Sequence, residues 1–175
     1  MKQLFYLLMP LLLAMTGCGY TLVGQGNLPT HIKTIAIPVF ENTTLEEGIE
    51  QSITNAAVQE FARGGKVKLV SEDKADALLT GKIVLYKNKE GVQYENVDDK
   101  TEVKTYKLTV AVNVELKDLV NDTVLWKTEG LSENQDYEGG PEIGATEEKD
   151  NEREALAEIS KRLAGKIRAL STEGF

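Results

Sequence analysis

The sequence predicts a two-layer α+β fold, with two helices packed on one face of a mostly antiparallel sheet of four to five strands. Residues 104–117 alternate apolar and polar side chains, which is typical of a strand with one buried face. Two other segments carry apolar residues at helical spacing. The elements follow in the order strand, helix, four strands and helix, so both helices can cover the same face of the sheet.

The first strand is expected at residues 32–40, where Pro38 indicates an edge or the end of the strand. A helix follows, because residues 42–44 offer N-cap side chains and the acidic residues 46–47 suit a first helical turn. Glycines 64–65 end this helix. Its buried face is expected to contain Leu45, Ile49, Ile53, Ala56, Ala57 and Phe61.

Four further strands are expected at residues 67–70, 78–86, 104–117 and 123–131, and the pattern predicts antiparallel pairs joined by hairpins. The buried face of the longest strand consists of Tyr106, Leu108, Val110, Val112, Val114 and Leu116. Residues 132–148 are acidic and are expected to form a loop. The chain closes with a helix whose apolar stripe consists of Leu156, Ile159, Leu163, Ile167 and Leu170.

The composition excludes several classes of protein. The chain has 175 residues, with 20 Lys and Arg against 28 Asp and Glu, so its formal net charge is −8. Binding to nucleic acid needs a basic surface, so no nucleic acid partner is expected. With one His and one Cys, a single chain cannot supply a multi-ligand zinc site, an iron–sulfur cluster or a disulfide framework. No metal or other cofactor is expected.

No group of residues indicates catalysis. His31 has no nearby nucleophile signature and is interpreted as a surface residue at the start of a strand. The glycines of residues 24–26 precede a strand instead of following one, which does not fit a dinucleotide site. The acidic pairs at 46–47 and 147–148 lie where helix starts favour negative charge. The chain is therefore not expected to be an enzyme.

The first eighteen residues resemble a bacterial lipoprotein signal. Lys2 gives a positive start, residues 4–15 are apolar apart from one proline, and residues 15–18, Met-Thr-Gly-Cys, resemble a lipobox. The apolar run is too short to span a bilayer, which needs about 20 residues. The resemblance implies that Cys18 carries a diacylglyceryl thioether and an amide-linked acyl chain such as palmitate. The alternatives are a helix with a buried cysteine, or a signal cleaved elsewhere that leaves a free thiol.

Four segments are expected along the chain: a cleaved signal peptide at 1–17, a lipidated leader at 18–30, an α+β domain at 31–171 and a tail at 172–175. The residue after the cysteine is Gly19 and not Asp. In enterobacterial lipoproteins, Asp at this position favours retention at the inner membrane. The resemblance therefore favours a lipid-anchored location at the outer membrane.

Several motifs then occur in order. They are Cys-Gly-Tyr-Thr-Leu-Val-Gly at 18–24, Leu-Pro at 28–29, Ile-Lys-Thr-Ile-Ala-Ile-Pro-Val-Phe-Glu-Asn-Thr-Thr at 32–44 and the helix over 48–61. Together they resemble the LptE family of lipopolysaccharide-assembly lipoproteins. The resemblance implies a non-catalytic plug inside the outer-membrane β-barrel LptD, which assists barrel assembly and lipopolysaccharide insertion into the outer leaflet. The alternative is a CsgG- or TolB-like periplasmic assembly lipoprotein that is not associated with lipopolysaccharide export.

Lipopolysaccharide is anionic, so the distribution of charge matters more than its total. Without residues 1–17 the net charge is −9; residues 108–154 carry −9 and residues 63–107 carry +2. Ammonium groups in the basic segment are candidates to bind lipid A phosphates through charge-assisted hydrogen bonds. The candidate lipopolysaccharide-binding residues are Lys82, Lys87, Lys89, Lys104 and Lys107, with Lys100 nearby. The alternative is that these are ordinary solvated lysines, because Glu90, Glu95, Asp98, Asp99 and Glu102 lie close to them in the sequence.

Overall fold

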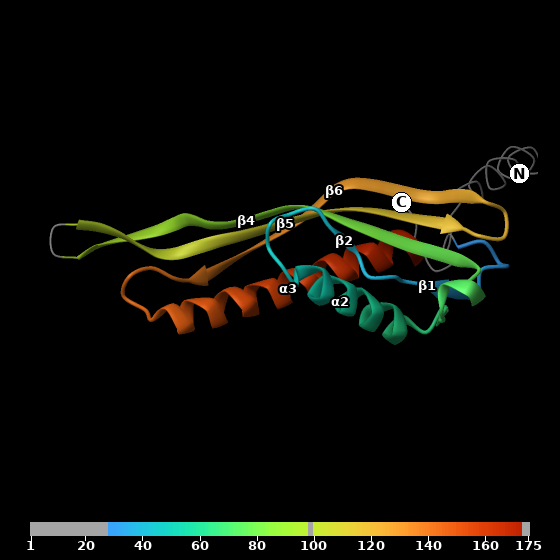
Figure 1. The fold of residues 1–175 in the computed structure, drawn as a ribbon, viewed down its shortest axis with the longest axis horizontal. Helices are drawn as coiled ribbons and strands as arrows, with labels where there is room; N and C mark the ends of the chain where they lie inside the picture. The colour runs from blue at the N-terminus through green and yellow to red at the C-terminus, as the bar shows by residue number, and fades with distance from the viewer. Residues whose placement is uncertain (1–27, 98–99, 173–175) are drawn as a thin grey trace, which may run out of the picture.

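The computed structural model describes residues 28–97 and 100–172, so the predicted signal peptide and Cys18 lie outside the described residues. The elements, labelled as in Figure 1, are β1 (Thr34–Ala36), β2 (Glu41–Asn42), α2 (Ile49–Gly64), β3 (Lys68–Leu69), the short 3₁₀ helix η2 (Glu72–Lys74), β4 (Ala77–Val97), β5 (Lys100–Asp118), β6 (Thr123–Glu138) and α3 (Ala145–Thr172).

The strands form one mixed sheet in the order β3-β1-β4-β5-β6, with β2 also paired to β4. The three long strands β4, β5 and β6 are antiparallel, whereas β1 and β2 run parallel to β4. Figure 1 shows α2 and α3 together on one face of this sheet. The predicted two-layer α+β fold is therefore confirmed. The described sheet has six strands instead of four or five, because the two-residue β2 was not expected.

The strand predicted at residues 32–40 is two separate strands. β1 ends at Ala36 and β2 begins at Glu41, with Pro38 between them. Proline has no backbone N–H, so it cannot continue a hydrogen-bonded ladder. The two short strands pair with successive parts of β4, at Leu78 and at Lys82.

Helix α2 begins later than the sequence suggests. Gly48, with φ 82°, precedes it, and no side chain caps its first turn. Asn42 instead orders the preceding loop, where its Oδ1 accepts hydrogen bonds from the backbone N–H and the hydroxyl of Thr44 at 2.9 and 2.8 Å. Leu45 lies in this loop and is fully exposed, so its assignment to the buried helix face is wrong. The helix ends as predicted, with Gly65 in the left-handed conformation that a C-cap favours.

The long strands continue beyond their predicted ends. β4 and β5 form a hairpin that reaches past both helices (Figure 1). β6 runs to Glu138 and α3 begins at Ala145, so the loop predicted at 132–148 is wrong at both ends and is confined to residues 139–144. Glu133 and Gln135 of β6 accept hydrogen bonds from the guanidinium of Arg162 on α3, so this part of the strand contacts the helix through polar residues and lacks the apolar alternation that would have predicted a strand.

The core fills the space between the sheet and the two helices. Every second residue of β5 from Leu108 to Leu116 is buried, as predicted. The ring of Phe40 lies over Gly81 of β4, where an added Cβ would be 2.3 Å from the ring. The helix side of the core contains Ile53, Ala57, Phe61, Leu156, Ile159, Leu163 and Ile167. Among the described residues, no helix covers the other face of the sheet, which is called the helix-free face below.

Candidate functional site

Three of the five predicted lysines lie on the helix-free face of the sheet. Lys82 and Lys87 of β4 are opposite Asn113 and Thr109 of β5, and these positions alternate with the buried residues of β5. Lys107 likewise lies next to the buried Leu108 in β5. Side chains alternate between the two faces of a strand, so all three ammonium groups point away from α2 and α3.

A bulge in β4 puts Lys82 and Lys87 on the same face. Two residues five positions apart in a regular strand point to opposite faces. The register with β5 shifts between Ile83 and Leu85, and the extra residue restores the common face. The bulge depends on pairing with β5, which explains why the sequence alone does not place these lysines.

Each lysine on this face has a carboxylate near it. Lys82 Nζ is 2.9 Å from Glu41 Oε1, and Lys87 Nζ is 3.1 Å from Glu90 Oε2. Within the part of the chain that the structure describes, Lys107 makes no ion pair, although Asp136 of β6 is opposite it. Exposed ion pairs contribute at most about 1 kcal/mol, so the paired lysines remain able to bind other anions. The acids nevertheless lower the positive potential of this face.

The other two lysines have different environments. On the hairpin, Lys104 Nζ is 2.9 Å from Glu95 Oε2, and this hydrogen bond raises the pKa of Lys104. Lys89 has a left-handed backbone, with φ 58°, and its Nζ is 2.6 Å from Glu148 Oε1 on α3. The hydrogen bond to Glu148 raises the pKa of Lys89. The five lysines therefore do not form a single cationic cluster.

Polar contacts near Lys89 attach the start of α3 to the sheet. The hydroxyl of Tyr86 donates a 2.6 Å hydrogen bond to Glu152 Oε1, and that of Tyr137 donates a 2.6 Å hydrogen bond to Asn88 Oδ1. Burial raises the pKa of both hydroxyls, that of Tyr137 to about 12. No residue of 145–154 is buried, so the contacts of Tyr86 with Glu152 and of Lys89 with Glu148 hold this part of α3 in place of apolar packing.

Sequence reasoning did not single out this group of residues. The one available signal was an aromatic residue at an inward position of each long strand. Those residues are Tyr86, Tyr106 and Tyr137, of which Tyr106 and Tyr137 have ring centroids 5.9 Å apart. Glu152 of α3, which accepts the hydrogen bond from Tyr86, is 66 residues away in the chain, so no local pattern reveals the contact.

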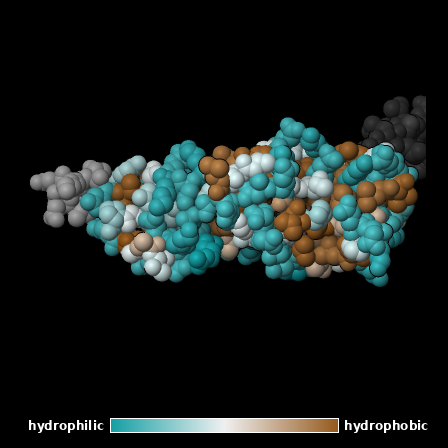
Figure 2. Space-filling model, viewed as in Figure 1, coloured by the Kyte–Doolittle hydropathy of each residue, from teal (hydrophilic) through white to brown (hydrophobic). Residues whose placement is uncertain are grey.

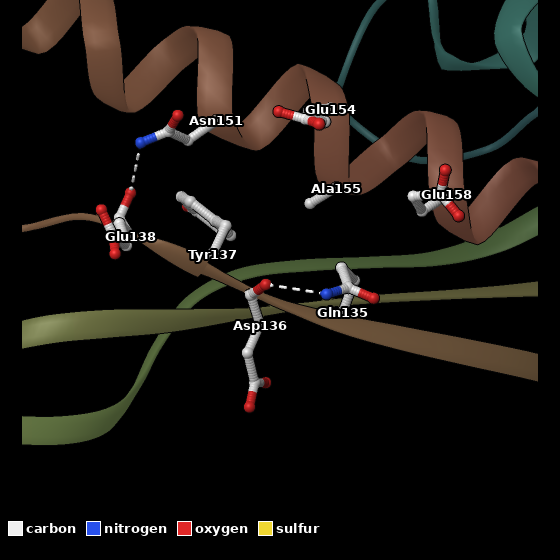
Figure 3. Close-up of a pocket in the computed structure, with 8 residues that line it drawn as sticks. All are labelled: Gln135, Asp136, Tyr137, Glu138, Asn151, Glu154, Ala155 and Glu158. Carbon is white, nitrogen blue, oxygen red and sulfur yellow. Dashed lines mark hydrogen bonds between the residues drawn. The ribbon is translucent and has the colours of Figure 1, made fainter.

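A hollow of about 220 Å³ lies between β6 and α3 beside these contacts (Figure 3). Its carboxylate lining comes from Glu138, Glu154 and Glu158, and Asn151 Nδ2 donates a 3.1 Å hydrogen bond to the Glu138 carbonyl. Figure 3 shows the Asp136 carboxylate pointing away from α3, which agrees with its place opposite Lys107. Carboxylates repel phosphate, so this hollow does not suit an anionic glycolipid.

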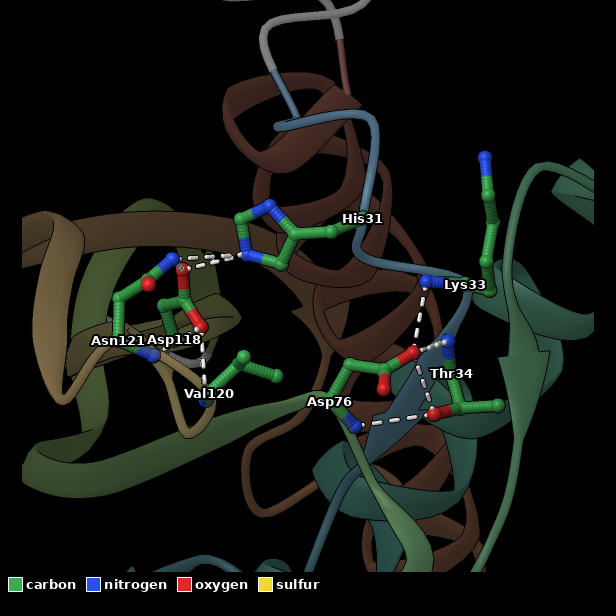
Figure 4. Close-up of polar contacts among 7 residues, drawn as sticks. All are labelled: His31, Lys33, Thr34, Asp76, Asp118, Val120 and Asn121. Atoms are coloured by element: carbon green, nitrogen blue, oxygen red, sulfur yellow. Dashed lines mark hydrogen bonds and ion pairs between the residues drawn. The ribbon is translucent and has the colours of Figure 1, made fainter.

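Asp118 orders the turn between β5 and β6 (Figure 4). This buried carboxylate accepts hydrogen bonds from the backbone N–H groups of Val120 and Asn121 at 2.9 and 3.1 Å, and from Asn121 Nδ2 at 2.9 Å. His31 Nε2 lies 2.7 Å from its Oδ2. Burial opposes ionisation, but the hydrogen bonds outweigh it and lower the pKa of Asp118 to about 2. His31, which was expected at the surface, is thus a partly exposed partner of a buried acid.

Asp76 orders the start of β1 in a similar way (Figure 4). Its Oδ2 accepts hydrogen bonds from the backbone N–H groups of Lys33 and Thr34 and from the Thr34 hydroxyl, each at 2.8 Å. The bond from the Lys33 N–H contributes most to lowering the pKa of Asp76. Asp118 thus stabilises a turn, and Asp76 stabilises the start of a strand.

Within residues 28–97 and 100–172, no three His, Cys, Asp or Glu residues are arranged to hold a metal ion. No helix in that part of the chain is long and apolar enough to cross a membrane. The predicted lipidation site, Cys18, lies outside it.

Solved structures of several bacterial proteins have a similar fold. A putative lipoprotein from Caulobacter crescentus CB15 is 14% identical over 74% of this chain and 85% of its own, with a TM-score of 0.50. The PelC dodecamer from Paraburkholderia phytofirmans is 20% identical over 83% and 92%, with a TM-score of 0.48. A minor lipoprotein from Acinetobacter baumannii is 15% identical over 82% and 92%, with a TM-score of 0.48. At these identities the likeness concerns the fold alone.

No curated protein matches the sequence. The family model LptE, described as lipopolysaccharide-assembly, matches residues 32–169, which include every strand and nearly all of α3. The resemblance predicted from the motifs is therefore confirmed. The family consists of assembly lipoproteins without enzymatic activity, in agreement with the expectation from the sequence. This chain belongs to the LptE lipopolysaccharide-assembly family.

Proposed function

We propose that this chain is an outer-membrane lipoprotein that forms a plug in the β-barrel LptD, assists its assembly and helps to insert lipopolysaccharide into the outer leaflet. The observation that carries the proposal is the LptE family match over residues 32–169. Residues 1–17 act as a cleaved signal peptide, and acylated Cys18 anchors the leader that precedes the domain. Two or more acyl chains give stable anchoring, whereas one gives only marginal anchoring.

The helix-free face of the sheet supports the role of a plug. The lumen of a large outer-membrane barrel is polar. The face carries the charged side chains of Lys82, Lys87 and Lys107, each close to a carboxylate, together with the exposed Val84 and Leu85 of β4. The ion pairs of Lys82 and Lys87 lower the cost of placing this face against a polar wall, because burying an unpaired charge is costly.

The partner is tested by copurification from the outer membrane. A tag at the C-terminus and mild detergent extraction should recover one large β-barrel in a one-to-one ratio with the tagged chain. The variant Cys18→Ala is the control: it should lose fatty-acid labelling and the outer-membrane location. A ring of identical subunits without a barrel would support the CsgG-like alternative and contradict the proposal, as would a wild-type chain that takes up no fatty acid.

We further propose that the lysines on the helix-free face bind lipid A phosphates directly. Lys107 is the strongest candidate because, among the described residues, it forms no ion pair. Lys82 and Lys87 add to the site when phosphate replaces their exposed carboxylate partners. Lys104 contributes from the hairpin, and Lys89 contributes least because Glu148 of α3 already binds it.

Charge reversal at Lys107 tests this binding. The variant Lys107→Glu should bind purified lipopolysaccharide about 5-fold more weakly, since one exposed ion pair is worth about 1 kcal/mol. The matched control is Lys161→Glu, which makes the same charge change on the exposed side of α3. Equal affinity of both variants would contradict a site at Lys107. Circular dichroism should show that both variants keep the fold.

A further inference from the structure

The turn between β5 and β6 displays apolar side chains to the solvent. Leu119, Val120 and Val124 are 37%, 62% and 52% exposed. They lie within six residues, whereas the other exposed large apolar residues of the described chain are spread over four separate segments. Turn tips usually carry Gly, Asn, Asp or Ser. A cluster of apolar residues at such a tip is typical of a contact surface.

This turn is held in place by many hydrogen bonds. Asp118 accepts bonds from the N–H groups of Val120 and Asn121, and the N–H of Leu119 donates to the Asp76 carbonyl at 2.8 Å. The apolar side chains are thus presented on an ordered backbone. An ordered surface loses little conformational entropy when it binds.

The turn lies at the end of the molecule where the described chain begins. His31 Nε2 is 2.7 Å from Asp118 Oδ2 and 3.2 Å from Asn121 Nδ2, so the segment after residue 28 packs against the turn. Figure 2, seen as in Figure 1, shows hydrophobic atoms at the right-hand end, where this turn lies. His31 is thirteen positions after Cys18 in the sequence, a separation that spans at most about 45 Å when fully extended.

Charges on the turn do not oppose an approach to a membrane. The carboxylate of Asp118 is buried, and that of Asp122 pairs with the ammonium of Lys117. Lys33, two residues after His31, is exposed, and Figure 4 shows its ammonium directed away from Asp76. Lys33 thus adds one exposed positive charge to the segment whose His31 contacts the turn, and positive charge favours the surface of an anionic membrane.

We infer that the β5–β6 turn inserts Leu119, Val120 and Val124 into the interface of the lipid bilayer to which the chain is anchored. This contact rests on the proposed acylation of Cys18, because the tether supplies the high effective concentration that a small apolar cluster needs. The turn is then a second point of attachment at the end of the domain near residue 28, and the β4–β5 hairpin lies at the opposite end (Figure 1).

The test uses the full acylated chain in vesicles of phosphatidylethanolamine and phosphatidylglycerol. Cys18 is the only cysteine and its sulfur is blocked by the lipid, so Val120→Cys can be labelled selectively with an environment-sensitive thiol probe. The control is Leu45→Cys, at a fully exposed leucine in a loop before α2. Both sites are exposed, so neither substitution removes a core contact.

Interfacial side chains lie about 5–10 Å within the boundary between head groups and acyl chains. The probe at residue 120 should therefore emit at a shorter wavelength than in water, and a lipid-borne quencher should remove about half of its intensity. The probe at residue 45 should keep the emission wavelength and intensity that it has in water. Identical behaviour at both positions in acylated protein would overturn the contact alone. Labelling of the wild-type chain at Cys18 would show a free thiol, and would overturn the anchor together with this contact.

Discussion

The hydroxyl of Tyr86 on β4 donates a 2.6 Å hydrogen bond to Glu152 Oε1 on α3, and this contact joins residues that are 66 positions apart in the chain. It lies where α3 has no buried residue, over residues 145–154. The start of the helix therefore depends on polar contacts with the hairpin, whereas the rest of the helix packs its apolar stripe on the sheet.

Tyr86→Phe is expected to destabilise the fold by about 1–3 kcal/mol, because a hydrogen bond to a charged acceptor is lost and Glu152 keeps a partly desolvated carboxylate. Urea unfolding measures the loss of stability, and amide hydrogen exchange should become faster mainly over residues 145–154. Tyr94→Phe is the control, since Tyr94 is 60% exposed, and it should change stability by less than about 0.5 kcal/mol. Equal effects of the two variants would contradict the role of the Tyr86 bond.

Two glycine substitutions should have opposite effects. Gly81→Ala would put a Cβ 2.3 Å from the buried ring of Phe40, and such overpacking costs about 1–3 kcal/mol. Gly165→Ala, inside α3 with no atom within 4 Å of the new Cβ, should stabilise the protein by about 0.5–1 kcal/mol through helix propensity. Thermal unfolding distinguishes the two, and a Gly81→Ala variant as stable as the wild type would refute the packing of Phe40 on β4.

Arg162 should contribute more to stability than another arginine on the same helix. Its guanidinium donates to Glu133 Oε2 at 3.0 Å, to Gln135 Oε1 at 3.0 Å and to the Asn134 carbonyl at 2.7 Å. Arg162→Ala is expected to cost about 1.5–3 kcal/mol, because bonds from a charged donor are lost and Glu133 keeps only Lys166. Arg153→Ala removes an exposed pair with Asp150 and should cost at most about 0.5 kcal/mol. Chemical denaturation of both variants provides the comparison, and similar losses would exclude a special role for Arg162.

Asp118 should make stability depend on pH in the acidic range. Its pKa in the folded chain is about 2, below the ordinary value of 3.8, so its contribution is present above the unfolded pKa and is lost as pH falls through the folded pKa. Stability should therefore decrease between about pH 5 and pH 2, and Asp118→Asn should show a shallower decrease. Urea unfolding at a series of pH values tests this. The difference between variant and wild type separates Asp118 from Asp76, Glu133 and Glu148, whose pKa values are also lowered. Parallel pH curves for the two proteins would contradict the assignment.

The sequence by itself determined the two-layer α+β fold and the family. The alternation from Leu108 to Leu116 and the stripe from Leu156 to Ile167 are local patterns, because side chains repeat every two residues in a strand and about every 3.6 residues in a helix. The motifs that indicated the LptE family lie within short segments as well, and the family match over residues 32–169 confirms them.

Only the tertiary structure decided how the polar residues are used. It placed Glu133 against Arg162 in a strand predicted as a loop, and it left Leu45 fully exposed. It also put Lys89 on the helix side of the sheet, whereas a bulge in β4 put Lys82 and Lys87 on the opposite face. The physical reason is that a hydrogen bond or a bulge depends on the partner strand or helix, which is distant in sequence, whereas periodicity depends only on neighbouring residues.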